Sequence, residues 1–414
     1  MRFYLFLFFT ILILYASLKK PYLGTLVLIG FYYMNPNIWG PEWFRPVHWI
    51  SATTILSVSW HQKKIQIGSI GWAMIVLLVG LWISADYAIA SQNIAKQYWH
   101  TLLLLFFAYY VFYNITLLDT KQFVVLFLWL NLAGVLYMSK AAIYYYLTVS
   151  NIQRIDAVGG QGGGANFFAM LIDMILYFVI CQLISSNKKI HKLLFMLIIG
   201  ILLFSLILTG SRAGFLGLIL VILSIIKDHS RRNFLKAILI VASLGIAFVM
   251  FVPDYFWERM ATTIHYEEEA SASDRIVEWS AAMELFSKHP FIGIGPNNFY
   301  LVSHKLTGIV AGILPNGQPH GLVTHNMYFQ LLCEGGLLSF IPFCIIVGIS
   351  YFRLRLMSLS RSSSDDIDNT LVIGSIKSAF VIFLFCGIFG SILHRDIFYW
   401  LLGIINGLYE NKYA

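Results

Sequence analysis

The longest polar stretch of the sequence, Pro253–Phe340, includes Ser271-Ala272-Ser273-Asp274-Arg275-Ile276-Val277-Glu278-Trp279 and, farther along, Thr324-His325-Asn326. It passes an acidic cluster at residues 267–269, and hydrophobicity resumes around Glu334-Gly335-Gly336. Every other hydrophilic connection is much shorter. If the chain catalyses a reaction, we expect the chemistry here, where a polar loop meets the mouth of a membrane bundle.

Outside this stretch the sequence is apolar, since 59% of its 414 residues are hydrophobic and 12% are charged. Backbone polar groups in lipid must be satisfied within the segment, so repeated long apolar runs indicate helices. We therefore expect an all-α polytopic membrane protein with about 12 to 13 transmembrane helices, each near the length that crosses a bilayer. The runs lie near residues 3–18, 22–34, 46–60, 69–87, 98–117, 122–148, 165–185, 190–209, 211–226, 234–252, 324–352 and 371–392, and the tail 397–409 is one more crossing or a re-entrant piece.

Lysine and arginine gather in short loops on alternate connections, so the net charge of +8 indicates membrane topology rather than nucleic-acid binding. These loops share the cytoplasmic side by the positive-inside rule, which places the loop 253–323 on the outer side. We expect three parts: a transmembrane bundle at 1–252, this large loop at 253–323, and further transmembrane helices at 324–414. The other outward connections are 35–45, 88–97, 150–164 and 209–211.

Two outward connections carry an arginine beside glycines. Arg154 precedes a glycine-rich loop that ends at Asn166, and such a loop at a helix N-terminus can bind anions through backbone N–H groups. A flexible linker explains the same composition. In Thr209-Gly210-Ser211-Arg212, Arg212 enters an apolar run within its first turn. An intramembrane arginine usually faces a partner or a water-filled cavity, although it can also snorkel to the interface.

The large loop predicts one amphipathic helix at about 274–288, started by the capping-box spacing of Ser271 and Asp274 and ended before Pro290. Its apolar face would lie along the membrane surface or cover the bundle. Arg275 and Glu278 are one turn apart and are expected to pair. The apolar face consists of Ile276, Trp279, Met283 and Phe286.

Two titratable residues follow at the start of the next membrane segment. His325 can accept a proton from a hydroxyl nucleophile, although a histidine at a helix end is often only structural. Glu334 comes nine residues later and, at 3.6 residues per turn, would lie on the opposite helix face from His325. We interpret Glu334 as a structural buried acid rather than a catalytic one.

Taken together, these stretches resemble the O-antigen ligase family and its relatives, the O-antigen polymerases and bacterial O-oligosaccharyltransferases. The opening Lys20-Pro21 and Met34-Asn35-Pro36 are most similar to the ligase-like proteins found near exosortase systems. The resemblance spans most of the chain. It is carried by Arg154 with the loop to Asn166, by Gly210-Ser211-Arg212-Ala213-Gly214, by Arg275–Trp279 followed by His289–Phe299, and by Thr324-His325-Asn326 leading to Glu334-Gly335-Gly336.

The resemblance implies a GT-C-like glycosyltransferase of the bacterial inner membrane, multi-pass, with its active site facing the periplasm. It would transfer a glycan from undecaprenyl pyrophosphate to a hydroxyl acceptor, most often the lipid A core of lipopolysaccharide, without a metal or nucleotide cofactor. His325 would act as the general base with Arg275 beside it. Arg212, Arg154 and Arg275 would bind the donor pyrophosphate, because guanidinium matches phosphate geometry. Supporting roles fall to Asn166, Asn326 and Glu334.

Alternative functions stay open from the sequence. O-antigen polymerases and protein O-oligosaccharyltransferases of the same superfamily share the donor half of the site, so the acceptor is not identified. A transporter or flippase for lipid-linked glycan is a further hypothesis, since broken helices and intramembrane arginines also occur there. No inverted repeat is evident in the sequence, and a loop as long as 253–323 favours the enzyme.

Overall fold

The computed structural model of the protein describes residues 2–34, 46–62, 66–118, 120–149, 155, 164–228, 270–359 and 367–413. The expected helix at 234–252, the acidic cluster at 267–269, Arg154 and most of the glycine-rich loop lie outside these residues. The predicted three-part division of the chain therefore stays a prediction.

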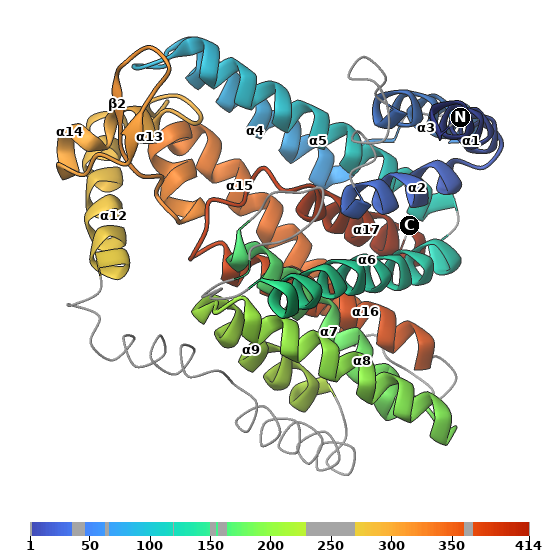
Figure 1. The fold of residues 1–414 in the computed structure, drawn as a ribbon. Helices are drawn as coiled ribbons and strands as arrows, with labels where there is room; N and C mark the ends of the chain where they lie inside the picture. The colour runs from blue at the N-terminus through green and yellow to red at the C-terminus, as the bar shows by residue number, and fades with distance from the viewer. Residues whose placement is uncertain are drawn as a thin grey trace.

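Every apolar run predicted within the described residues forms a helix (Figure 1). A two-stranded antiparallel pair, β1 (Gly312–Ile313) with β2 (Pro319–His320), completes the described elements. The helices are α1 (Arg2–Lys19), α2 (Pro21–Met34), α3 (Pro46–Gln62), α4 (Gly68–Asp86), α5 (Gln92–Leu118), α6 (Thr120–Thr148), α7 (Ala165–Ser185), α8 (Lys189–Leu208), α9 (Arg212–Asp228), α12 (Ala270–Lys288), α13 (Phe299–Val302), α14 (His304–Thr307), α15 (Met327–Leu359), α16 (Ile367–Cys386) and α17 (Asp396–Tyr413).

Among the described helices, six are long and apolar enough to cross a membrane: α4, α5, α6, α7, α8 and α15. Shorter apolar helices lie in α1, α2 and α16. The chain is thus nearly all-helical and has the character of a multi-pass membrane protein. The total number of crossings and the GT-C-like architecture stay predictions.

Several predicted boundaries need correction. α5 begins at Gln92, so the outward connection before it is shorter than the expected 88–97. α15 begins at Met327 rather than 324 and continues to Leu359, and its backbone is non-helical at Gly336. α16 ends at Cys386 instead of 392. The tail forms one continuous helix of 18 residues, α17.

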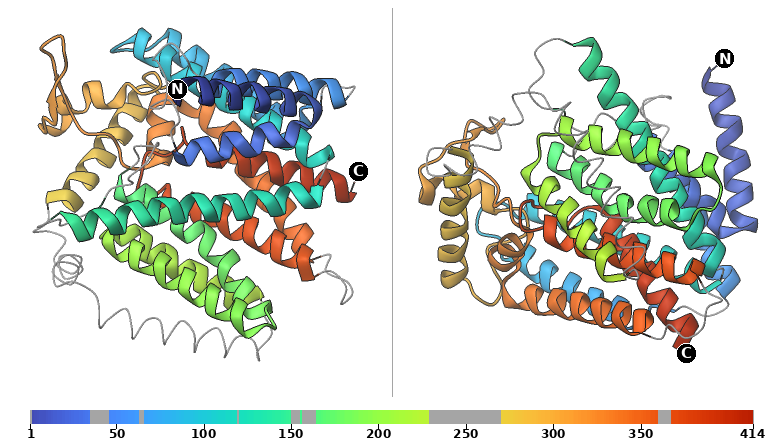
Figure 2. Two further views of the ribbon diagram at one scale, coloured as in Figure 1. Left: turned by 45° about the vertical axis from the view of Figure 1, so that its right-hand side comes forward. Right: turned by 90° about the horizontal axis from the view of Figure 1, so that it is seen from below.

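α7 is the helix around which the lower half of the bundle packs, and it contacts α8, α9 and α16 (Figure 2). In the most apolar window of α7, 89% of the residues are buried, compared with 33% in α8. A helix that is apolar on all sides is buried either in protein or in a membrane. α7 is therefore enclosed by its neighbours, whereas α8 exposes most of its surface to the lipid.

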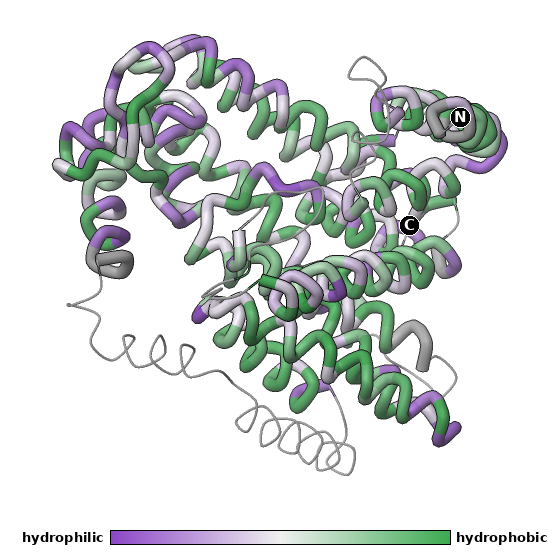
Figure 3. Tube along the Cα trace, viewed as in Figure 1, coloured by the Kyte–Doolittle hydropathy of each residue, from purple (hydrophilic) through white to green (hydrophobic). Residues whose placement is uncertain are grey.

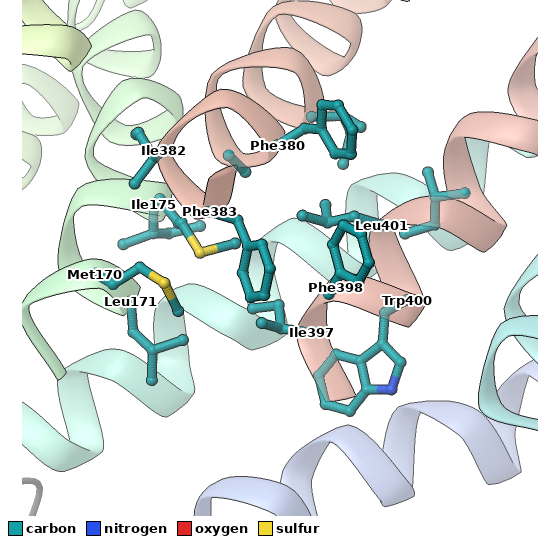
Figure 4. Packing of buried hydrophobic residues seen from close by; sticks show 14 of the residues in the cluster. Met170, Leu171, Ile175, Phe380, Ile382, Phe383, Ile397, Phe398, Trp400 and Leu401 are labelled. Carbon is teal, nitrogen blue, oxygen red and sulfur yellow. The ribbon is translucent and has the colours of Figure 1, made fainter. Parts of the chain in front are cut away.

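Aromatic rings join α16 and α17 to the rest of the core (Figure 4). Phe398 of α17 stacks on Phe383 of α16 with ring centroids 4.8 Å apart, and Trp400 stacks on Phe112 of α5 at 5.2 Å. Aromatic pairs at such distances stabilise a core beyond the area that they bury. The burial of α17 fixes the position of its first residues, which lie near the site described below.

One end of the bundle is covered by α12, α13, α14 and the β1–β2 pair (Figure 1). Hydrophilic residues concentrate around these elements, while green apolar residues dominate the helices behind them (Figure 3). These elements belong to the loop that the basic-residue pattern predicts on the outer side. The covered end is therefore called the outer end below.

The opposite end of α15 carries a basic residue with a dense set of contacts. Arg353 donates to Ser69 Oγ at 2.9 Å and lies 3.6 Å from a Glu410 carboxylate oxygen. Its guanidinium also lies 4.5 Å from the centre of the Tyr409 ring. Arg353 is the first of a group of basic residues in 353–361, which the positive-inside rule predicts on the cytoplasmic side, so this anchored arginine marks the end away from the candidate site.

Candidate active site

Arg212 is the first residue of α9 and is positioned by a capped helix start. Gly210 takes a positive φ of 55°, which separates α8 from α9. Ser211 Oγ accepts a hydrogen bond from the Gly214 N–H at 3.1 Å, the usual N-cap arrangement. The same hydroxyl donates to Asn166 Oδ1 at 2.9 Å and so ties the start of α9 to the start of α7. Asn166 therefore fixes the segment that carries Arg212.

His325 lies in the segment before α15 rather than inside the helix. Its φ is +50°, a left-handed conformation that is uncommon for a residue with a Cβ. Asn326 caps α15, because its Oδ1 accepts from the N–H groups of Tyr328 at 2.9 Å and Phe329 at 3.1 Å. The prediction that His325 and Glu334 lie on opposite faces of one helix is wrong, since α15 begins after His325.

Three elements surround the His325 segment. The Trp279 indole N–H of α12 donates to the Thr324 carbonyl at 2.9 Å. The Thr324 hydroxyl lies 3.2 Å from the hydroxyl of Ser391, and the Met327 N–H donates to the Gly387 carbonyl at 2.8 Å. His325 is thus held between α12, the start of α15 and the connection 387–395.

Arg275 of α12 lies close enough to His325 for its charge to act on the imidazole. Burial lowers the pKa of His325 below its ordinary value of 6.5, and the positive charge of Arg275 lowers it further. Both effects disfavour the protonated ring. His325 is therefore neutral at neutral pH and keeps a free lone pair to accept a proton.

Glu334 is buried and holds a loop rather than facing His325. Its carboxylate accepts from the N–H groups of Asn297 at 2.8 Å and Phe299 at 3.0 Å, and from Gln330 Nε2 at 3.1 Å. Its carbonyl accepts from the Gly295 N–H at 3.0 Å. These contacts agree with the interpretation of Glu334 as a structural acid.

The two glycine-bearing motifs of the loop pack against each other through their backbones. The Ile294 N–H donates to the Cys333 carbonyl at 2.9 Å, and the Leu338 N–H donates to the Phe291 carbonyl at 3.0 Å. Gly293 and Gly336 both take positive φ, 76° and 61°, and a Cβ on either would meet the backbone of the other segment. This close approach explains why both segments carry glycine.

The buried face of α12 overlaps the predicted one only in part, because Trp279 and Phe286 are half-buried against the bundle while the other two predicted residues are not. Ile276 and Met283 are exposed, whereas Glu278, Ala282 and Leu285 are buried. α12 begins at Ala270, and its small side chains allow it to approach α14 and α15 closely. The cluster beneath it consists of Ala281, Ala282, Leu285, Ile294, Phe299 and Cys333.

Glu278 does not form the expected hydrogen bond with Arg275. The residue is fully buried, and neither carboxylate oxygen has a hydrogen-bond partner in the described part of the chain. Burial raises the pKa of Glu278 to about 7, with a further contribution from the negative charge of Asp274. The Glu278 carboxylate therefore accepts no hydrogen bond from Arg275.

Two residues of the site were missed by sequence reasoning, His394 and Arg395, in the connection 387–395. The Arg395 guanidinium lies 4.3 Å from the centre of the Phe167 ring, next to Asn166. Burial, followed by the charge of Arg395, lowers the pKa of His394 to about 4, which makes His394 a weak base. The sequence contained a signal for these two residues, because the polar triplet His394-Arg395-Asp396 separates two apolar runs.

The predicted site residues fall into two groups in the structure. Arg275, His325 and Asn326 form one, and Asn166 with Arg212 forms the other. The connection 387–395 contacts a neighbour of each group, since Ser391 lies against Thr324 and Arg395 stacks on Phe167. Glu334 lies behind the first group, and Arg154 lies outside the described residues. Within those residues, no group of three or more His, Cys, Asp or Glu side chains could hold a metal ion.

The comparisons with known proteins bear on the central part of the chain. None of the curated proteins compared with it matches. Residues 195–344 match the family described as O-antigen ligase. This range begins in α8 and ends in α15, and it contains Arg212, Arg275, His325 and Glu334. The match to the O-antigen ligase family therefore covers the part of the chain that carries Arg212, Arg275 and His325.

Proposed function

We propose that the protein is an inner-membrane glycosyltransferase that transfers a glycan from undecaprenyl pyrophosphate to a hydroxyl acceptor. As a ligase, it would use the lipid A core of lipopolysaccharide as that acceptor. The observation that carries the proposal is the pairing of a neutral, half-buried His325 with the charge of Arg275 at the outer end of a membrane bundle.

The reaction requires a base and a set of cations. His325 accepts the proton of the acceptor hydroxyl as that oxygen forms a bond to the anomeric carbon of the donor glycan. The bond from the anomeric carbon to the pyrophosphate oxygen breaks, and undecaprenyl pyrophosphate leaves with the bonding electron pair. Arg275 and Arg212 stabilise the negative charge that develops on this leaving group. The proton on His325 then returns to solvent.

The location of the site follows from charge and hydropathy. The elements α12–α14 cover the end of the bundle opposite the basic loop at Arg353, so we place the site on the periplasmic face. Exposed apolar side chains of α12, such as Ile276 and Met283, support a position of this helix along the membrane surface. A lipid-linked donor embedded in the outer leaflet would present its pyrophosphate at this depth.

Trp279 provides a test of how α12 positions His325. Trp279→Phe keeps an aromatic ring against Phe329, whose centroid is 5.5 Å away, but removes the hydrogen bond to the Thr324 carbonyl. Loss of one such bond costs about 1 kcal/mol, so we expect turnover to fall about fivefold with donor affinity unchanged. Steady-state kinetics with a donor-binding assay would check this. An unchanged kcat would show that the indole hydrogen bond does not position His325.

The proposed activity is tested with purified protein in nanodiscs, a chemically defined undecaprenyl-pyrophosphate glycan and several acceptors, including lipid A core. We expect a glycosylated acceptor that can be separated by gel electrophoresis. Absence of product with every acceptor, together with absence of donor binding, would overturn the proposal. Product formed only with a glycan end or a protein would keep the reaction class and change the acceptor.

A further inference from the structure

The connection 387–395 brings a cation to the site that the mechanism above does not use. Arg395 directly precedes α17, whose position is fixed by the stacking of Phe398 on α16. Earlier in the same connection, Ser391 contacts Thr324, and the Gly387 carbonyl accepts from the Met327 N–H. Arg395 therefore belongs to the outer end of the bundle, together with His325.

The side chain of Arg395 contacts the start of α7, which is hydrogen-bonded to the start of α9. Its guanidinium carbon lies over the Phe167 ring, at 4.3 Å from the ring centre. Phe167 follows Asn166, which accepts the hydrogen bond of Ser211 immediately before Arg212. Arg395 thus links the connection 387–395, which contacts the His325 segment, to the start of α7, which is hydrogen-bonded to the start of α9.

Arg395 forms no ion pair within salt-bridge distance among the described residues, and its charge acts on the carboxyl group of Asp396, the next residue in the chain. Its guanidinium forms no hydrogen bond within the described residues either, and its Nε is buried without a partner. Its charge acts on the phenols of Tyr32 and Tyr98, whose hydroxyl groups are also buried without a hydrogen bond. A half-buried guanidinium at membrane depth is costly unless an anion compensates it. Stacking on Phe167 supplies only part of that compensation.

We propose that Arg395 binds the pyrophosphate of the lipid-linked donor, as a third cation beside Arg275 and Arg212. The inference rests on the proposed function, because it assigns a further residue to the donor half of the same site. A guanidinium offers parallel N–H donors to two phosphate oxygens, which a single ammonium cannot match. The stack on Phe167 would hold the plane of this group in place before the donor arrives.

The test measures binding of undecaprenyl pyrophosphate to the full-length protein in nanodiscs. Because charge-assisted hydrogen bonds are among the strong ones, we expect Arg395→Gln to weaken binding about 10- to 100-fold. Arg395→Lys keeps the charge and should recover only part of the affinity. The matched control is Arg353→Gln, since Arg353 also stacks on an aromatic ring but lies at the other end of α15. It should leave affinity unchanged.

The outcomes separate this inference from the proposed function. If the unmodified protein does not bind undecaprenyl pyrophosphate, both fail. If it binds, and Arg275→Gln weakens binding while Arg395→Gln does not, the proposed function survives and the role of Arg395 is refuted. Thermal unfolding shows which variants fold. Should Arg395→Gln not fold, Arg395→Lys decides: a folded protein with reduced affinity supports the proposal, and unchanged affinity overturns it.

Discussion

We expect His325→Ala to lower kcat by about 10²- to 10⁴-fold, the usual cost of losing a general base. Binding of the donor should change little, because the imidazole meets the acceptor hydroxyl rather than the pyrophosphate. Asn326 still caps α15 in this variant and Trp279 still holds the Thr324 carbonyl, so the surrounding backbone keeps its anchors. Single-turnover kinetics with a separate donor-binding measurement would check the expectation.

A second histidine of the same loop provides the control for this variant. His320 lies in β2, where its ring packs against Tyr300 at 5.8 Å and its Nδ1 lies 3.0 Å from the Gly321 carbonyl. Because its recorded contacts are with Tyr300, Gly312 and Gly321 and not with Arg275 or His325, His320→Ala should change kcat by no more than about twofold. Equal losses in the two variants would contradict a specific role for His325.

The pH dependence of turnover follows from the same residue. A general base works only when it is unprotonated, so kcat/KM should fall as the pH drops through the pKa of His325. Because burial and Arg275 lower that pKa, the acidic limb should lie below pH 6.5. Removing the positive charge in Arg275→Gln should move the limb to higher pH. A limb that persists in His325→Ala would assign the titration to another group.

Arg275→Ala should weaken donor binding and turnover together, because the guanidinium contacts the pyrophosphate both before and during the reaction. We expect a loss of about 10- to 100-fold in donor affinity, the range of a charged hydrogen bond. Arg275→Lys should recover part of it, since an ammonium lacks the two parallel donors of guanidinium. Isothermal titration with undecaprenyl pyrophosphate would measure both variants.

The control for Arg275 removes the same charge from an exposed position. Lys305 of α14 lies in the same loop and is exposed to solvent. Lys305→Ala should leave donor affinity nearly unchanged, because exposed charges are screened by salt over short distances. If Lys305→Ala and Arg275→Ala weakened binding equally, donor binding would depend on the overall positive potential of the loop and not on the specific contact that we propose.

The positions of the helices could be predicted from the sequence because membrane crossing requires long apolar runs. Each such run within the described residues forms a helix, and Ser211 caps α9 at the position where the apolar pattern resumes. The ends were less certain. α15 starts at Met327 because the side chain of Asn326 satisfies its first N–H groups, a local contact that hydropathy does not register.

The arrangement of the site depended on tertiary contacts that periodicity cannot reveal. α12 buries Glu278 and two alanines together with Leu285, while Ile276 and Met283 stay exposed, because small residues allow close approach to α14 and α15. His325 was identified, but its left-handed backbone and its proximity to Arg275 come from the packing of α12. Arg395 was overlooked because its partner, Phe167, lies more than two hundred residues earlier in the chain.

The most direct test of the central claim follows one donor molecule in proteoliposomes. Undecaprenyl-pyrophosphate glycan, labelled on both the lipid and the sugar, is supplied with a hydroxyl acceptor on the side of the membrane that α12 faces. We predict that one undecaprenyl pyrophosphate is released for each glycan transferred, and that His325→Ala abolishes both. Intact donor that appears on the opposite leaflet, with its sugar–phosphate bond unbroken and no glycosylated acceptor, would contradict the account and indicate a transporter.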